Sequence, residues 1–457
     1  MNAILIPPKT SPETAPENYG SGRYYARFSQ TERLSDTPGE LYPAIWVFEA
    51  FDRDWFEANQ LPSSPNGLEG YYNRPELYVL ELRIESVMVW PVAGLAAIHA
   101  ADVDDAEPND WFVLQAAPLG GRVPNEGEIP MTIYPNLYAA GTAATLLEAR
   151  PADPATSARL DRAASTAHIP DASEQDVDNA MAGVASASIE WVVIYDVGQG
   201  NAIGLCEPSG SVKGYFDLGG GVTGNAKTFP TVLTHFCFTQ QPTIILSHWD
   251  FDHWSSANRD TRSQSMTWIA PRQSVGPTHL ALMTSIQSTG KLLLIPTGFP
   301  AKRHGQVYLE LCTGKGRNHS GLALTLSKQA TGAGDQMLFP GDARYTYILS
   351  FPNPPKNQYV SAVVPHHGGD MRSRTVPLCP SVSHSRLLYS FGAGNTFSHP
   401  RQVTRVDHHN AAWRNPHIGS GSTFEVREMA NRGTKPLGHV YPHVCPCAPV
   451  WRCVLSI

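Results

Sequence analysis

The six residues His248-Trp249-Asp250-Phe251-Asp252-His253 constrain this chain more than any other segment. They follow the apolar run 243–247, which predicts a buried strand. Two imidazoles and two carboxylates this close together are ligand types that bind divalent metal ions, and binding residues gather where a strand gives way to a loop. The segment therefore predicts a metal site. The alternative is a solvated acidic turn that carries two histidines by chance.

Four other strand-like runs lead into residues of the same chemical types. The runs end near residues 195, 339, 364 and 391, and glycine or proline punctuates the turns after them. The ligand-type residues that follow these runs are Asp196, Asp342, the pair His366 and His367, and the loop residues Asn395 and His399. This repetition predicts one site assembled from several strand ends.

The order of these motifs resembles the metallo-β-lactamase superfamily. The motifs read DVGQG, HWDFDH, GD, HHG and N…HP, and they are most similar to the branch that includes the soluble hydrolase domain of ComEC-type DNA-uptake proteins. Phosphorylcholine esterases share the general layout. The resemblance covers residues 186–428 and implies an α/β fold, the metallo-β-lactamase αββα sandwich. It does not extend to residues 1–180.

The resemblance also implies a set of metal ligands. His248 and Asp250 would bind a first ion, Asp252 and His253 a second, and Asp342 would bridge the two. The second ion would be completed by His367 or, alternatively, by His366, with the other histidine of the pair facing the substrate. Asp196 would lie behind the ligands and fix their loop, and Asn395 and His399 would line the pocket as catalytic residues.

Two departures from the family pattern affect the metal. Asp250 stands where the family has a second histidine, and an oxygen ligand favours Mn²⁺ or Mg²⁺ relative to an all-imidazole zinc site. In addition, none of the three histidines between the HWDFDH and GD motifs is a clear counterpart of a further family ligand; they are His279, His304 and His319. We therefore expect two divalent ions, Mn²⁺ or Zn²⁺ with Mg²⁺ as a further option, and a first site that is poor in ligands.

The implied chemistry is hydrolysis. Two ions about 3.5–4 Å apart activate a bridging water and stabilise an in-line displacement, which suits a phosphodiester, and Asp252 or the spare histidine could move protons. The leading hypothesis is a metal-dependent phosphodiesterase or nuclease. The first alternative is a hydrolase of a small ester (phosphocholine, lactone or cyclic nucleotide), with Trp249 and Trp254 as pocket walls. The second is a catalytically silent subunit of a multi-protein system, by analogy one of bacterial defence.

The net charge of -7 conceals an asymmetry. Residues 1–190 hold 28 acidic and 11 basic residues, a net of -17, whereas residues 301–415 hold 5 acidic and 13 basic residues, a net of +8. The acidic part suggests an intramolecular contact or a contact with a protein partner, and the basic part suggests a nucleic acid or another phosphodiester substrate. The expected substrate rim comprises Arg344, Arg372, Arg374, Arg401 and Arg405; the alternative is ordinary solvated arginines.

Two segments lie outside the hydrolase-like region at its N-terminal side. Residues 1–135 predict an accessory α+β lobe, with a half-exposed strand at 78–85 and enough tryptophan for its own core: Trp46, Trp55, Trp90 and Trp111. Residues 136–185 are rich in alanine and predict a linker of short helices.

The C-terminal tail, residues 429–457, contains a cluster that could hold a structural Zn²⁺: His439, His443, Cys445, Cys447 and Cys453. Its spacing matches no standard zinc finger, and core cysteines in a final strand are the alternative. The total of seven cysteines is odd, which favours a reducing cytoplasm over a disulfide framework. The apolar stretch 86–101 contains Pro91 and is too short to span a membrane, and the N-terminus does not read as a signal peptide.

Overall fold

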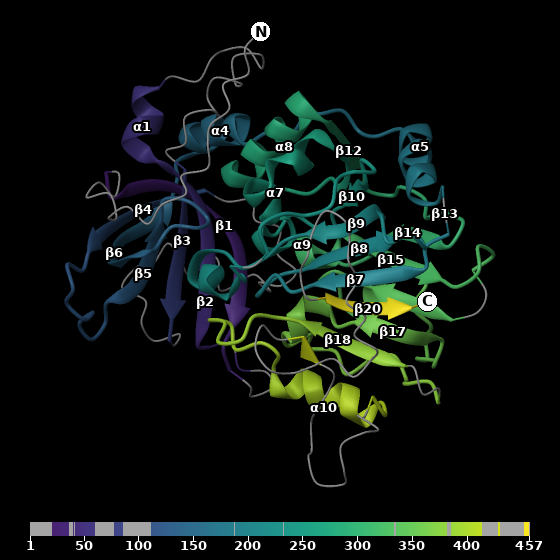
Figure 1. Ribbon diagram of the computed structural model, residues 1–457. Coiled ribbons are helices and arrows are strands. Elements are labelled where there is room, and N and C mark those ends of the chain that lie inside the picture. Colours follow the sequence, from purple (N-terminus) through teal and green to yellow (C-terminus); the bar gives the residue numbers. More distant parts are fainter. Residues whose placement is uncertain are drawn as a thin grey trace.

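The computed structural model describes residues 21–35, 40, 42–59, 77–85, 111–186, 188–231, 233–332, 335–381 and 385–413, and the backbone of two further strands at 428–429 and 452–456. These residues form a closed β-barrel that lies beside a body of two stacked sheets (Figure 1). The protein is thus a mixed α/β structure. No helix among these residues has the length and apolar character needed to cross a bilayer.

The barrel consists of six antiparallel strands in the order β1-β2-β3-β5-β6-β4. Alternate residues of each strand fill its interior, for example Phe48, Leu80 and Phe112, which are all 2% exposed or less. The strands are β1 (Arg23–Arg33), β2 (Ala44–Asp52), β3 (Leu77–Ile84), β4 (Trp111–Pro118), β5 (Ile129–Tyr134) and β6 (Thr142–Pro151).

Three expectations for this lobe need correction. It is a barrel with one short helix, α1 (Arg53–Ala58), rather than an α+β lobe. The linker predicted at 136–185 begins with a barrel strand, β6, and only α4 (Pro154–Ala163) and α5 (Glu174–Val184) are helical. The strand predicted as half-exposed is β3: on its outer face Val79 and Glu81 are buried, whereas Arg83 and Glu85 are exposed, so the prediction is wrong only for the first half of that face.

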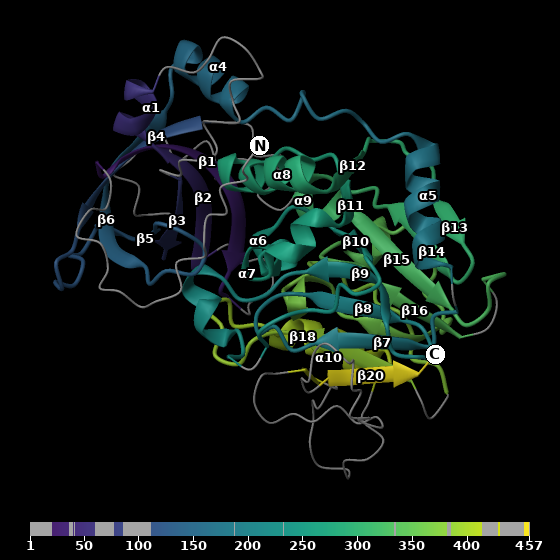
Figure 2. The ribbon, with the colours of Figure 1, turned by 45° about the horizontal axis from the view of Figure 1, so that its top comes forward.

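The body contains two seven-stranded sheets (Figure 2). The first has the order β12-β11-β10-β9-β8-β7-β20 and the second β13-β14-β15-β16-β17-β18-β19. The strands of the first are β7 (Trp191–Tyr195), β8 (Ala202–Cys206), β9 (Val212–Leu218), β10 (Thr243–Ile245), β11 (Thr267–Pro271), β12 (Lys291–Ile295) and β20 (Arg452–Ser456). Those of the second are β13 (Lys302–His304), β14 (Val307–Leu311), β15 (Leu322–Ser327), β16 (Gln336–Phe339), β17 (Tyr359–Val363), β18 (Arg386–Ser390) and β19 (Glu428–Met429).

The two sheets pack face to face through one apolar core. Ile203 and Ile245 of the first sheet meet Leu324 and Phe339 of the second, and all four are 1% exposed or less. Short helices and turns connect the strands: α6 (Phe251–Trp254), α7 (Ser256–Arg259), α8 (Pro277–Thr289), α9 (Gly316–His319), α10 (Gln402–Asn410), and the 3-10 turns η3 (Thr223–Thr228), η4 (Thr261–Ser265), η5 (Tyr345–Tyr347) and η6 (Pro365–Gly368).

The outer face of each sheet is covered by a separate core. Helix α8 packs on the first sheet through Leu280, Met283 and Ile286, in a core that also includes barrel residues such as Val47. The outer face of the second sheet buries Tyr389 together with Trp413, which follows α10. Because the barrel shares a core with the body, the two parts are packed as one unit.

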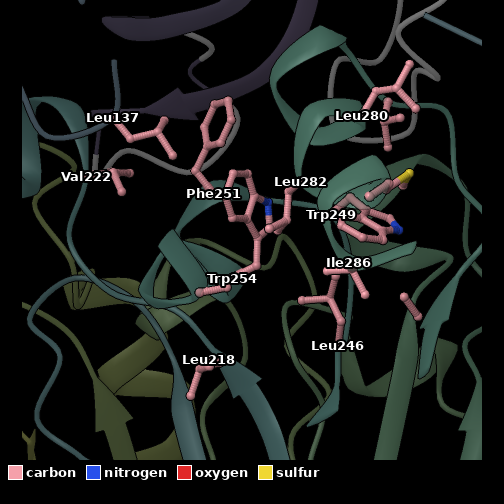
Figure 3. Close-up of a cluster of buried hydrophobic side chains, with 14 of the residues drawn as sticks. Leu137, Leu218, Val222, Leu246, Trp249, Phe251, Trp254, Leu280, Leu282 and Ile286 are labelled. Atoms are coloured by element: carbon pink, nitrogen blue, oxygen red, sulfur yellow. The ribbon is translucent and has the colours of Figure 1, made fainter. Parts of the chain in front are cut away.

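Trp249 and Trp254 belong to the core beneath α8. Both are 0% exposed and lie among Leu282, Ile286 and their neighbours (Figure 3). Trp249 Nε1 donates a hydrogen bond to the carbonyl of Pro271. The prediction that these two rings form pocket walls is therefore wrong, because burial under a helix gives them a packing role.

The fold brings several strand ends to one edge. Strands β9, β10, β11 and β12 run parallel to one another, as do β16, β17 and β18. The carboxyl ends of parallel neighbours lie at the same edge of a sheet. Asp217 in β9, the segment 247–253 after β10, Asp342 after β16 and the histidine pair after β17 therefore meet there.

Candidate metal centre

Four side chains direct donor atoms to one point. The Nε2 atoms of His253 and His367 lie 3.2 Å apart, and Asp342 Oδ1 lies 3.0 Å from the first and 3.8 Å from the second. Asp252 Oδ2 lies 3.1 Å from His367 Nε2, and Asp252 Oδ1 lies 3.8 Å from His253 Nε2. Tetrahedral bonds of about 2.0–2.1 Å place ligand atoms about 3.3 Å apart, so these five distances of 3.0–3.8 Å suit side chains that share one ion. We call these four residues the four-ligand centre.

Both histidines of the centre are oriented from behind. His253 Nδ1 lies 2.8 Å from Asp217 Oδ2. His367 Nδ1 donates to the carbonyl of Ser390 at 2.7 Å. Because a carbonyl only accepts, the proton of neutral His367 is on Nδ1 and its Nε2 lone pair faces the centre; a carboxylate behind His253 favours the same tautomer. Partners of this kind fix metal-binding imidazoles in proteins.

Asp217 is a functional residue that the sequence analysis missed. It is fully buried and also accepts hydrogen bonds from the backbone N–H of Ser247 at 2.6 Å and from Asn201 Nδ2 at 3.1 Å. A signal was available, because Asp217 stands near the end of a strand before three glycines in the run YFDLGGG. The predicted supporting residue, Asp196, instead accepts from the N–H of Gly198 within its own turn.

Asp342 is placed by a tight turn after β16. Gly341 has a φ of 58°, and a Cβ on it would lie 2.6 Å from that of Ser247, so glycine is needed at this close approach. Burial alone would raise the pKa of Asp342, but the charges of His253 and His367 outweigh it and hold the pKa well below its usual range. The carboxyl group is therefore an anion beside protonated imidazoles, whose Nε2 protons an ion binding there would displace.

His248 and Asp250 form a pair beside the centre, and His248 also has ligand-type spacing to His253 and Asp342. His248 Nε2 lies 3.3 Å from Asp250 Oδ2 and 3.8 Å from Asp342 Oδ2. The other oxygen of Asp250 lies 3.2 Å from the Nε of Arg317, a buried cation that the sequence analysis did not single out. Burial would raise the pKa of Asp250, but Arg317 and then His248 lower it well below its usual range.

None of the three histidines considered for the first ion joins a ligand cluster within the described residues. His279 is buried among aromatic rings, with Nε2 3.4 Å from Glu49 Oε1. His304, on β13, pairs with Asp178 on α5. His319 packs against Tyr347, and burial followed by the charge of Arg344 lowers its pKa to about 3.

The other histidine of the pair, His366, contacts the barrel. Its Nε2 lies 2.7 Å from Oε1 of Glu32 on β1, and His399 Nε2 lies 3.4 Å from Glu32 Oε2. Gln199 Nε2 lies 3.3 Å from His399 Nδ1, so the amide can donate there while His399 donates to Glu32. Burial would raise the pKa of Glu32, but His366 and His399 lower it to about 2. The barrel thus inserts a carboxylate beside the four-ligand centre.

This arrangement distinguishes the two histidines that the sequence left open. His367 belongs to the four-ligand centre, whereas His366 and His399 form a second cluster with Glu32 that has ligand-type spacing of its own. Asn395 does not contact these rings directly. Its side chain bonds to the backbone of Gly392, Phe397 and His399, and so it holds the loop that carries His399.

The five arginines do not form the predicted exposed rim. Arg401 is 2% exposed and donates to the carbonyl of Phe397. Arg374 is exposed but pairs with Asp407 at 2.9 Å. The remaining three, Arg344, Arg372 and Arg405, are half-buried. The prediction rested on a count of charges along the chain, and such a count does not distinguish buried from exposed guanidinium groups.

A narrow pocket leads to Asp252 between the barrel and the body. Asp252 retains 15% side-chain exposure, against 3% or less for the other three members of the centre. Gln30 contributes an Oε1 that is buried without a hydrogen-bond partner, and burial raises the pKa of Glu81. The residues that line the pocket are Gln30, Val47, Glu81, Gln199, Val222, Thr223, Asn225, Phe251, Asp252 and Phe397.

The cysteines are of two kinds within the described residues. Cys237 is disulfide-bonded, whereas Cys206, Cys312 and Cys379 are thiols. The disulfide contradicts the expectation of a fully reduced chain, and the compartment stays a prediction. The zinc cluster expected in the tail lies outside the described side chains: His439, His443, Cys445, Cys447 and Cys453.

No protein-family model matches this chain, and no curated protein matches it in sequence.

Proposed function

We propose that this protein is a metal-dependent hydrolase of the metallo-β-lactamase type that acts on a small ester, with phosphodiesters included. The observation that carries the proposal is the four-ligand centre, in which donor atoms of Asp252, His253, Asp342 and His367 lie 3.0–3.8 Å apart in the measured pairs. Imidazoles and carboxylates gathered at one buried point are costly to remove from water, and a bound ion would offset that cost.

The architecture supports the proposed fold type. Two sheets packed face to face, with α8 outside one and α10 outside the other, correspond to the helix–sheet–sheet–helix order that the motif resemblance implies. The ligand-bearing segments follow β10, β16 and β17, which is where that resemblance requires them.

A divalent ion bound at this centre would lower the pKa of a water and polarise an ester or phosphoryl oxygen. The chain's own residues prepare the site for this chemistry. Asp217 and the carbonyl of Ser390 fix the two imidazoles, and Asp342 remains ionised. Asp252 is the most exposed member and faces the pocket, so the substrate would approach from its side. Glu32 orients His366, the partly exposed histidine that could exchange a proton beside the centre.

The pocket favours a small substrate over a polynucleotide. Its walls include Phe251 and Phe397, and the barrel residues Gln30, Val47 and Glu81 close one side. No lysine or arginine lines it. Polynucleotide binding draws much of its strength from contacts between phosphates and cationic side chains, and this pocket offers none. Its carboxyl groups, Glu81 and Asp252, instead suit a substrate whose leaving group is uncharged or cationic.

The test is a substrate panel with metal-stripped protein reloaded with Mn²⁺, Zn²⁺ or Mg²⁺. The panel contains chromogenic phosphodiesters and phosphocholine esters, lactones, cyclic nucleotides, DNA and RNA. We expect turnover of a small ester that is lost in Asp342→Asn and retained in His304→Gln, a matched control on β13 remote from the centre. Turnover confined to DNA or RNA and steeply weakened by salt would instead support the nuclease hypothesis. Metal binding without turnover of any substrate would support a silent subunit.

A further inference from the structure

The two oxygens of Asp250 face two different partners. Oδ2 lies 3.3 Å from His248 Nε2, on the side where the sequence analysis expects the first ion, and Oδ1 lies 3.2 Å from Arg317 Nε. Asp250 is 4% exposed and Arg317 is 6% exposed, so water does not screen this ion pair. One of the few ligands available to a first ion is therefore already neutralised by a side chain of the same protein.

Arg317 is held in this position by the barrel. Its Nη2 donates to both the carbonyl and the hydroxyl of Ser29 on β1, and its Nη1 lies 3.7 Å from Glu49 Oε1 on β2. Its own carbonyl accepts from Gln273 Nε2 at 2.7 Å. A guanidinium fixed at both its head and its backbone cannot move aside cheaply for a second cation.

The first-ion position also offers few donors. His248, Asp250 and the second oxygen of Asp342 face it, and the further histidine with ligand-type spacing to His248 and Asp342 is His253, which the four-ligand centre already uses. A divalent ion placed there would be close both to the ion of the four-ligand centre and to Arg317. Like charges this close inside a protein oppose each other strongly, so the position is disfavoured by charge as well as by ligand number.

We infer that the centre binds a single ion, between Asp252, His253, Asp342 and His367, and that Arg317 supplies at Asp250 the positive charge that a second ion would supply in the dinuclear arrangement. This inference rests on the proposed metal-dependent function and replaces the two-ion expectation. It also assigns a role to the barrel, which positions Arg317 through Ser29 and Glu49.

The test is the metal stoichiometry of the full-length protein. Chelator-treated protein is reloaded with Mn²⁺, desalted, and assayed for metal by mass spectrometry and for protein by amino-acid analysis. We expect one ion per chain and the electron paramagnetic resonance spectrum of an isolated Mn²⁺. Two ions per chain with a spin-coupled spectrum would overturn the inference but leave the proposed function intact. No bound ion at all would overturn both.

Two substitutions separate the charge of Arg317 from a structural role. Arg317→Gln removes the cation, and we expect metal content to rise toward two ions at high Mn²⁺ concentration, whereas the matched control Arg262→Gln, which removes a cation paired with Asp260 outside the centre, stays at one. A single ion in folded Arg317→Gln overturns the charge assignment.

If Arg317→Gln does not fold, as judged by circular dichroism and gel filtration, the metal content of Asp250→Asn tests the inference instead. Asparagine at position 250 keeps an oxygen facing Arg317, and Asp250 is not a ligand of the single ion, so the ion is retained with unchanged affinity. Loss of the ion from folded Asp250→Asn overturns the inference.

Discussion

The body and the barrel contribute to the same centre by different means. The body places its ligands at the ends of parallel strands, where Asp342 and His367 arrive through short loops. The barrel has no member of the four-ligand centre, and its Glu32 and Glu49 lie within strands and reach the centre only because the barrel docks there. The comparison separates residues that hold the ion from residues that shape what surrounds it.

The largest effect should come from the body's own ligands. Asp342→Asn and His367→Ala should each lower metal affinity by more than about 100-fold. Loss of a residue that only hydrogen-bonds to a metal ligand costs about 10–100-fold in affinity, and loss of the ligand itself costs more. Calorimetric titration of stripped protein with Mn²⁺ and Zn²⁺ measures this. Mn²⁺ should support activity at least as well as Zn²⁺, given two carboxylates in the set. Wild-type affinity in either variant would break the comparison.

The body also contains a group that tests stability far from the barrel. His408 on α10 is buried, with Nδ1 2.8 Å from the carbonyl of Thr404, and burial lowers its pKa from 6.5 to about 4. The unfolded chain takes up the proton below pH 6.5 and the folded chain only below about pH 4. This group therefore removes about 3 kcal/mol of unfolding free energy as the pH falls across that window.

Denaturant unfolding at several pH values, for the wild type and His408→Gln, checks this. The substitution should flatten the pH dependence between 6.5 and 4. Identical slopes for the two proteins would show that His408 titrates normally.

Asp217 and Asp196 allow a comparison between a carboxylate that orients a metal-binding histidine and one that bonds within a turn. Asp217→Asn should weaken metal binding or turnover about 10–100-fold, because it loses the carboxylate behind His253 Nδ1. Asp196→Asn should have a smaller effect, since Asp196 bonds only within its turn in the described contacts. The same titration distinguishes them, and an equal or reversed ranking would contradict the structure.

Glu32 tests the barrel's side of the comparison. Glu32→Gln should lower kcat about 10-fold while metal content stays unchanged, because the carboxylate orients His366 and does not hold the ion. Glu32→Asp should recover part of the loss if reach permits. If the substitution instead removed the metal, the barrel would supply a ligand and the distinction drawn above would fail.

The smallest effect is expected at the arginines. Arg374→Ala should change turnover of a small ester less than about 2-fold, because an exposed pair with Asp407 contributes little. Steady-state kinetics at low and high salt provide the check. A large, salt-dependent loss would bring back the polyanion hypothesis.

The sequence predicted the body's part of the site because strand-end motifs are local. A strand followed by His248 to His253, or by Asp342, can be read without knowledge of packing, and the structure brings these residues together. Glu32 has no comparable signal: it occupies a strand position whose neighbours in space are set by docking of the barrel. The roles of Arg317, Trp249 and Trp254 likewise follow from their burial, which the local sequence does not reveal.

The most direct test of the central claim is a crystal structure of the Mn²⁺- or Zn²⁺-loaded protein with an anomalous difference map recorded at the metal edge. The account predicts one strong peak between His253 Nε2, His367 Nε2, Asp342 Oδ1 and the carboxylate of Asp252, and no second peak beside Asp250. A map without a peak at this point, or with its only peak between Glu32, His366 and His399, would contradict it.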